Sequence, residues 1–306
     1  MNSQEWALIA FTILAQMSVG AFLVLGIIHT YAARKAGLEE ADRLSDRALI
    51  AIVITLGLGM LASLFHLGSP LSAPRAVTNL ATSWLSREIL AGVLFALLGV
   101  VFTAMQWFKI GTFAVRNVIA WAASVVGVFL IYAMSRIYML PIQPAWNTAA
   151  TPIAFYATTL LLGSLALGAA LVANYTINKS KNPDCEDTQC ELLRASLKGI
   201  SIAAIVLVGV ELVVLPLKIS YLSVSSAAGL ESVRMMVGAF GGIQVLQLIL
   251  AFLGAGVFGV FLYISAGKAG QEKAMSYLTY GAFVLVFAAE VIGRVIFYAT
   301  HQGLGL

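Results

Sequence analysis

A few side chains that can accept or donate protons stand at the borders of long apolar stretches in this chain. His66 closes the apolar run AIVITLGLGMLASLF, and Gly68 and Ser69 follow it within three residues, directly before a proline. Glu88 stands near the start of the next apolar run. Imidazole titrates near neutral pH, and imidazole and carboxylate groups both serve as proton acceptors for a reacting group. His66 and Glu88 are therefore candidates for proton-transfer chemistry at the edge of an apolar region.

Four further charged residues lie inside or at the ends of apolar runs: Arg87, Arg136, Glu290 and Arg294. Glu290 and Arg294 are four positions apart, so on a helix they share one face and can neutralise each other. Arg87 and Arg136 can extend to a membrane surface while their aliphatic stems stay in apolar surroundings. Structural roles of this kind stay open for each residue taken singly, and only a common location would indicate a shared site.

Composition indicates which elements must position these side chains. Of the 306 residues, 60% are hydrophobic and 10% are charged, whereas soluble domains carry about 25% charged residues. Apolar runs of roughly 20 residues recur, and a helix of that length crosses the hydrocarbon core of a bilayer. We therefore predict an all-α, polytopic membrane protein that forms a single integral-membrane domain over residues 1–306. Its eight predicted transmembrane helices cover about 7–32, 48–67, 87–107, 117–139, 153–176, 198–221, 238–266 and 276–299.

The distribution of basic residues predicts the orientation of these helices. Twelve of the 18 lysines and arginines fall in the connections after the first, third, fifth and seventh spans. Basic residues concentrate in cytoplasmic loops, so we expect the N- and C-termini to be periplasmic. The twelve residues are Arg34, Lys35, Arg43, Arg47, Lys109, Arg116, Lys179, Lys181, Arg194, Lys198, Lys268 and Lys273.

With that orientation, ionisable groups collect near the outer ends of the spans. The second, fourth, sixth and eighth spans run outward, and the third span opens on the outer side. The polar residues at these positions are His66, Arg87, Glu88, Ser135, Arg136, Glu211, Lys218, Glu290 and Arg294. Ionisable residues inside a membrane are costly and usually face a functional interior. A polar pocket in the outer half of the membrane is therefore expected.

Several classes of membrane protein compete for such a pocket. A transporter usually binds its substrate near the midplane between internal repeats, and the two halves of this chain show no convincing repeat. A two-haem carrier needs paired histidines on facing helices, whereas His29 and His66 lie at opposite ends of their spans. A site for a quinone, which exchanges protons and electrons from within the bilayer, remains.

The two cysteines do not form a metal-binding motif. Cys185 and Cys190 lie in a predicted cytoplasmic loop, where thiols stay reduced. They lack the second ligand pair that a structural zinc site needs. We therefore expect no haem and no iron–sulfur cluster to be ligated by this chain.

Two segments of the sequence resemble a known family. The segment FHLGSPLSAPRAVTNLATSWLSREIL resembles the second loop of the membrane anchor subunit of bacterial dimethyl sulfoxide reductase, and AAEVIGRVIFYAT resembles the last helix of that family. Length, eight spans and outward termini agree, so the resemblance covers the whole chain. The middle spans match only in hydropathy, and the loop with the two cysteines departs from the family pattern.

This resemblance implies a three-subunit complex in the bacterial inner membrane. The chain would anchor a molybdopterin catalytic subunit and a four-cluster iron–sulfur subunit on the periplasmic face. It would oxidise menaquinol and pass the electrons to the iron–sulfur subunit. His66 and Glu88 would accept protons, in a menaquinol pocket that also contains Gly68, Ser69, Arg87, Arg136, Glu290 and Arg294. Anchors of tetrathionate or polysulfide reductases, a non-redox anchor and a transporter remain alternatives.

Overall fold

The computed structural model describes residues 3–66, 79–181, 187–268 and 270–303. Within these ranges all regular structure is helical. The elements are α1 (Ser3–Ala36), α2 (Leu38–His66), α4 (Trp84–Trp107), α5 (Phe113–Tyr138), α6 (Ala150–Lys181), α7 (Asp187–Ser225), α8 (Ala227–Val237), α9 (Gly241–Ala251), the π-helix η3 (Phe252–Val257), α10 (Phe258–Ala266) and α11 (Glu272–Ala299). Eight helical segments in these ranges are long and apolar enough to cross a membrane, and α9, η3 and α10 together make one of them. The predicted all-α fold with eight membrane-length helices is confirmed.

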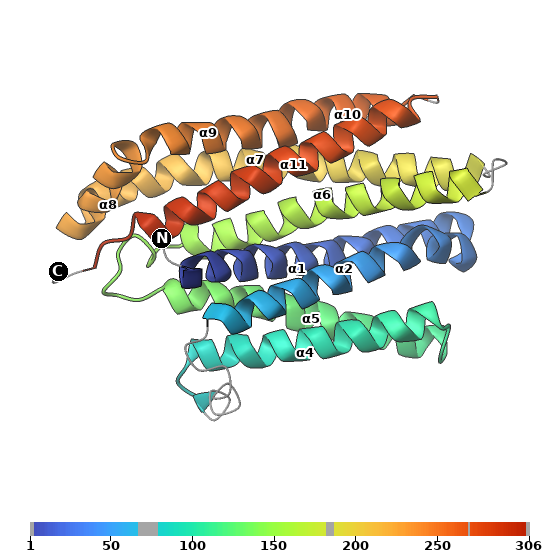
Figure 1. Cartoon of the computed structure of the whole chain (residues 1–306), viewed down its shortest axis with the longest axis horizontal. Helices are drawn as coiled ribbons and strands as arrows, with labels where there is room; N and C mark the ends of the chain where they lie inside the picture. Colours follow the sequence, from blue (N-terminus) through green and yellow to red (C-terminus); the bar gives the residue numbers. More distant parts are fainter. Residues whose placement is uncertain (1–2, 67–78, 182–186, 269, 304–306) are drawn as a thin grey trace.

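The helices form an elongated bundle with α1 and α6 in its middle (Figure 1). α1 packs against α2 and α6, and the pair α4 and α5 lies on one side of them. On the far side of α6 lie α7, α9, α10 and α11. α1 begins and α11 ends at the same end of the bundle, and α4 also begins there (Figure 1). We call this the termini end.

Several helices extend beyond the predicted spans at the end opposite to the termini. α2 begins at Leu38 rather than near residue 48, and α7 begins at Asp187 rather than near residue 198. Gly37 has a φ of +91°, a conformation open to glycine, and it joins α1 to α2 in a tight turn. A helix satisfies its own backbone hydrogen bonds in water as well as in lipid. Hydropathy therefore marks only the apolar part of each helix.

A charged network joins α1, α2 and the end of α4 at this opposite end. Lys109 Nζ lies 2.7 Å from Asp42 Oδ2 and 2.9 Å from Asp46 Oδ2. His29 Nε2 lies 2.9 Å from Asp42 Oδ1, and the Gln106 amide donates to the same oxygen at 2.6 Å. Burial lowers the pKa of Lys109, but the hydrogen bonds and charges of the two aspartates outweigh burial and raise this pKa above its ordinary value. His29 thus has a structural partner far from the predicted pocket.

The central helices α1 and α6 cross in backbone contact at two glycines. A Cβ atom on Gly163 would lie 2.3 Å from the carbonyl carbon of Gly20. A Cβ atom on Gly20 would lie 1.8 Å from the carbonyl oxygen of Thr159. Small residues allow membrane helices to approach this closely and to associate through van der Waals packing. The crossing therefore depends on glycine at both positions.

We propose that the termini end faces the periplasm, and reporter fusions test this orientation. Fusions after residues 40, 112, 187 and 270 are expected to give cytoplasmic signals, because those connections carry most of the basic residues. Fusions near Trp146 and Glu231 are expected to give periplasmic signals. The connection containing Arg75, expected on the same side, lies outside the described residues. Periplasmic signals at two or more of the first four positions would contradict the orientation.

Candidate functional site

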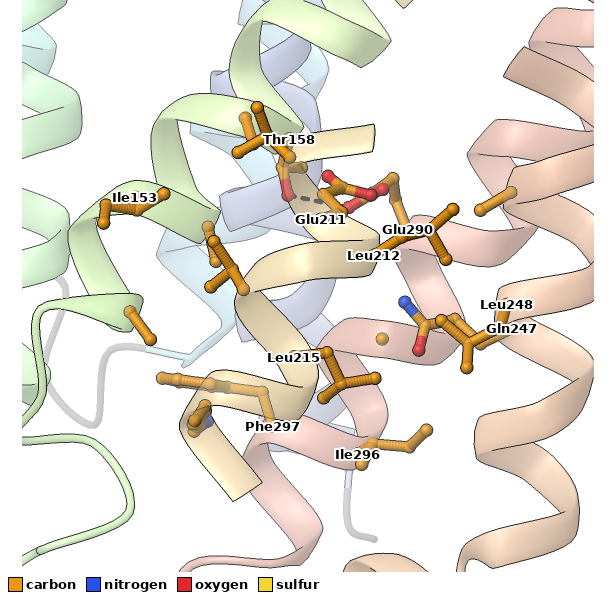
Figure 2. A pocket seen from close by; sticks show the side chains of 18 of the residues that line it. Ile153, Thr158, Glu211, Leu212, Leu215, Gln247, Leu248, Glu290, Ile296 and Phe297 are labelled. Atoms are coloured by element: carbon orange, nitrogen blue, oxygen red, sulfur yellow. Dashed lines mark hydrogen bonds between the residues drawn. The ribbon is translucent and has the colours of Figure 1, made fainter. Parts of the chain in front are cut away.

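A cavity of about 140 Å³ lies between α6, α7, α9 and α11, in the half of the bundle nearer the termini end (Figure 2). Much of its wall is apolar, yet four ionisable side chains contribute to it. Its lining includes Phe155, Thr158, Glu211, Leu212, Leu215, Lys218, Gln247, Leu248, Glu290, Arg294 and Phe297. The structure therefore brings Glu290 and Arg294, which the sequence placed in one pocket, together with Glu211 and Lys218.

The helices on either side of this cavity are irregular. α7 contains Pro216, which cannot donate a backbone hydrogen bond to the preceding turn. α9 continues into the π-helical turn η3, and such turns occur frequently at functional sites. α9 packs against α8 and α11, whereas α7 packs against α6, α8 and α10. The cavity occupies the space that this arrangement leaves between α7 and α9.

Two carboxyl groups meet at the inner end of the cavity. Glu290 is 6% exposed, and its Oε2 accepts a hydrogen bond from the Thr158 hydroxyl at 2.7 Å. The Glu211 carboxyl group, on α7, lies beside that of Glu290 (Figure 2). Adjacent carboxyl groups can share and exchange a proton, and they then titrate as a pair. The pair can therefore accept a proton from a ligand in the cavity.

Arg294 is held from across the bundle. Its Nη2 donates to Gln16 Oε1 at 2.5 Å, and the Gln16 amide donates to the carbonyl of Phe155 at 2.8 Å. The guanidinium also lies over the Phe155 ring, 4.1 Å from its centroid. Gln16 comes from α1 and Phe155 from α6, and both Arg294 and Gln16 are buried. These contacts fix the guanidinium at the edge of the cavity.

Lys218 occupies the outer part of the cavity. It lies on α7 seven residues after Glu211, and its Nζ is 5.6 Å from the centroid of the Phe297 ring. The sequence placed Glu211 and Lys218 among the polar residues expected at this depth but did not include them in the predicted menaquinol pocket. The signal that would have grouped them is their spacing of seven, which puts both on one face of a helix.

Two predicted site residues do not line this cavity: Arg87 is on α4 and Arg136 is on α5. Arg87 donates from Nε to the carbonyl of Leu80 at 2.8 Å and from Nη2 to the carbonyl of Ala81 at 2.7 Å. Its guanidinium lies 4.2 Å from the centroid of the Trp84 ring, and that of Arg136 lies 5.2 Å from the same ring. The two arginines thus flank Trp84, and Arg87 holds the segment that enters α4.

The proposed proton acceptors belong to this same end of the bundle. Glu88, on α4, is 8% exposed. His66 is the last residue of α2, and its side chain lies outside the described residues, as do Gly68 and Ser69. The structure therefore shows that Glu88 is buried at this end of the bundle. The contacts of His66, Gly68 and Ser69 stay predictions.

Two tyrosines form a hydrogen bond between α5 and α11 at this end of the bundle. The hydroxyl groups of Tyr138, on α5, and Tyr298, on α11, are 2.7 Å apart and hydrogen-bonded. Glu88 and Arg294 each act electrostatically on both tyrosines. The pair therefore joins α5 to α11, and the Tyr138 ring lies with its centroid 5.2 Å from that of Phe297, which lines the cavity.

Cys190 does not line this cavity. Cys190 Sγ is 3.6 Å from Glu272 Oε1, at the end opposite to the termini, and Cys185 lies outside the described residues. Among the residues that the structure describes, no group of three or more potential metal ligands is found.

These features define a class of protein: a multi-pass membrane protein with an ionisable cavity in one half of its bundle. Within that class, the protein belongs to the family of the DMSO reductase anchor subunit (DmsC), whose family model matches residues 1–300. The resemblance inferred from the two sequence segments is thereby confirmed.

Relatives with established names match along nearly the full length. The YnfH subunit of an anaerobic dimethyl sulfoxide reductase of Escherichia coli (strain K12) is 28% identical over 307 aligned positions, and the match covers 99% of this protein and 96% of the relative. The C subunit of anaerobic dimethyl sulfoxide reductase from the same organism is 28% identical over 310 residues, with the same coverage. The corresponding C subunit of Haemophilus influenzae is 28% identical over 304 residues, again with 99% and 96% covered.

Proposed function

We propose that this protein is the membrane anchor and menaquinol-oxidising subunit of a molybdopterin reductase complex of the dimethyl sulfoxide reductase type. The anchor role follows from the family. The observation that carries the quinol chemistry is the cavity in which Glu211, Lys218, Glu290 and Arg294 meet among apolar side chains. Ionisable groups are costly inside a membrane and mark proton, ion or ligand sites there.

The size and walls of the cavity suit a quinol head group. Its volume of about 140 Å³ is close to that of an engineered apolar cavity of about 150 Å³ that binds benzene. One aromatic ring therefore fits, while the second ring and the isoprenoid tail of menaquinol extend between α7 and α9 toward lipid. Leu212, Leu215 and Phe297 give the ring apolar walls, and the ionisable groups face its oxygen atoms.

Oxidation of a quinol to a quinone releases two protons and two electrons. In this proposal the Glu211–Glu290 pair takes up protons first, and Glu88 and His66 accept them nearer the surface. Proton acceptors must lie within hydrogen-bonding reach of the group they serve, directly or through one water. The electrons pass to an iron–sulfur cluster of the partner subunit.

The polar residues on the α4 side have a second proposed task. Arg87 and Arg136 border the same end of the bundle, next to the surface where the partner subunits would dock, and we assign Gly68 and Ser69 to the same task. We place a four-cluster iron–sulfur subunit and a molybdopterin catalytic subunit there, on the periplasmic face of the bacterial inner membrane. The names of the relatives, which are subunits of anaerobic dimethyl sulfoxide reductases, support partners of this kind.

Copurification followed by a turnover assay tests the proposed function. The protein, tagged and extracted from membranes, is expected to bring down a molybdopterin subunit and an iron–sulfur subunit, and the complex is expected to reduce dimethyl sulfoxide with menaquinol. Reduction of tetrathionate or polysulfide instead would assign a related reductase. An assembled complex that accepts electrons only from artificial donors would contradict quinol oxidation and leave a non-redox anchor. Absence of any partner would favour a transporter.

A further inference from the structure

The cavity has an acidic inner end and a basic outer end, and both are on one helix. Glu211 and Lys218 line it from α7 and are seven residues apart. Seven residues make about two helical turns, so the two Cα positions are separated by about 10.5 Å along the helix axis. A ligand between the two side chains therefore meets a carboxyl group at one end and an ammonium group at the other.

In the part of the chain that the structure describes, no acidic group neutralises Lys218. Among the described residues no carboxylate lies within ion-pair distance of its Nζ, and its aromatic neighbour is the Phe297 ring. A lysine in an apolar half of a membrane bundle usually pairs with another group or marks a ligand pathway. An oxygen atom of a ligand in the cavity would supply the missing acceptor.

The walls between these two ends favour a flat ring. Leu212 and Leu215 lie between Glu211 and Lys218 on α7, and Leu248 lies across from them on α9 (Figure 2). Phe297, from α11, also lines the cavity. Apolar and aromatic walls with a few placed polar groups are typical of small-molecule sites. The oxygen atoms of the ring then point along α7, one toward Glu211 and the other toward Lys218.

We propose that Glu211 and Lys218 bind the two opposite oxygens of a 1,4-dihydroxylated aromatic ring, and so select a para-quinol over ligands with one oxygen. One quinol hydroxyl donates to the Glu211 carboxyl group, and the Lys218 ammonium donates to the oxygen across the ring. The two para oxygens and their two hydrogen bonds together span about 11 Å, which matches the two-turn spacing on α7. This inference rests on the proposed quinol oxidation and names the groups that position its substrate.

Competition between one-oxygen and two-oxygen probes tests the assignment in the assembled complex. Reduced 2,3-dimethyl-1,4-naphthoquinone donates electrons, and bleaching of the iron–sulfur clusters is followed without a terminal acceptor. In the wild type, 4-methoxy-1-naphthol, whose hydroxyl group can donate to Glu211 while its para ether oxygen accepts from Lys218, is expected to compete about ten- to a hundred-fold more tightly than 1-naphthol, because it makes one more hydrogen bond to a charged group. In Lys218→Met this preference is expected to disappear, while the affinity for 1-naphthol stays unchanged.

Lys198→Met is the matched control for this substitution. Lys198 is also on α7 and half-buried, but it lies near the opposite end, 5.8 Å from the centroid of the Tyr263 ring. That variant is expected to keep the wild-type preference. Lys218→Met removes an unpaired charge from an apolar region, so assembly is expected to persist. Glu211→Gln, which preserves volume, is expected to weaken both competitors about equally, because both donate their hydroxyl group to Glu211.

The outcomes separate this inference from the proposed function. If the wild-type complex bleaches its clusters with the quinol but Lys218→Met keeps the full preference for two oxygens, or Glu211→Gln leaves both affinities unchanged, the assignment of that residue is wrong and quinol oxidation stands. If the wild-type complex does not respond to the quinol at all, the proposed function is wrong and this assignment is wrong with it.

Discussion

His66→Ala and Glu88→Gln are each expected to lower menaquinol-driven turnover about a hundred-fold or more, while the complex stays assembled and active with artificial electron donors. Removal of a positioned proton acceptor typically costs 10²- to 10⁴-fold in rate. Glu88 is buried at the termini end, and His66 closes α2 at that end. Artificial donors deliver electrons directly to the partner subunits and do not need these acceptors. The ratio of the two activities measures the effect.

A matched control for this prediction is Glu231→Gln. Glu231, on α8, is a half-exposed glutamate whose carboxylate lies 3.2 Å from Arg234 Nη1. Glu231 does not line the cavity and is not one of the proposed proton acceptors. Both activities are therefore expected to stay at the wild-type level. Normal menaquinol turnover in His66→Ala would show that this histidine only ends a helix. Equal loss of both activities would instead indicate a defect in assembly.

The spanning helices could be predicted from the sequence because the membrane imposes a simple requirement. Each crossing needs about 20 apolar residues with its backbone hydrogen bonds closed internally. The eight apolar runs therefore identify eight helices, and the structure has them. The short helix α8 (Ala227–Val237) was not predicted, because its amphipathic sequence lies in a connection and contains Glu231 and Arg234.

The helix ends opposite to the termini could not be placed by hydropathy. The first turns of α2 contain Asp42, Arg43 and Asp46, and hydropathy treats such residues as loop. Their helical geometry depends on partners from distant parts of the sequence, above all Lys109, which follows α4. Contacts of that kind are set by packing and are not local properties of the sequence.

The depth of the polar residues could be predicted, but their grouping could not. Orientation and helix length place Glu88, Arg136, Glu211 and Glu290 near one end. Which of them share a cavity depends on the rotation of each helix about its axis, and the structure groups Glu211 and Lys218 with Glu290. Gln16, which holds Arg294, was missed altogether. Its signal was a lone amide inside an otherwise apolar span.

Gly163→Ala is expected to prevent stable assembly of the protein. A Cβ atom at residue 163 would lie 2.3 Å from backbone atoms of Gly20 and Ala21. Backbone atoms cannot rotate away as the atoms of a flexible side chain do, so α1 and α6 must separate. Overpacking of this kind costs about 3 kcal/mol or more. The amount of protein in the membrane and its thermal unfolding midpoint in detergent measure the loss.

Gly199→Ala is the matched control, because a Cβ atom at that position of α7 meets nothing within 4 Å. It is expected to accumulate and unfold like the wild type. The crossing also bears on the site, since Gln16 lies one turn from Gly20 on α1 and donates to Phe155 on α6. If α1 moves away from α6, Gln16 can no longer hold Arg294, so any Gly163→Ala protein that does assemble is expected to lose menaquinol turnover before artificial-donor activity. Wild-type stability of Gly163→Ala would mean that α1 and α6 do not cross in backbone contact, and the link from this crossing to Arg294 would fall with it.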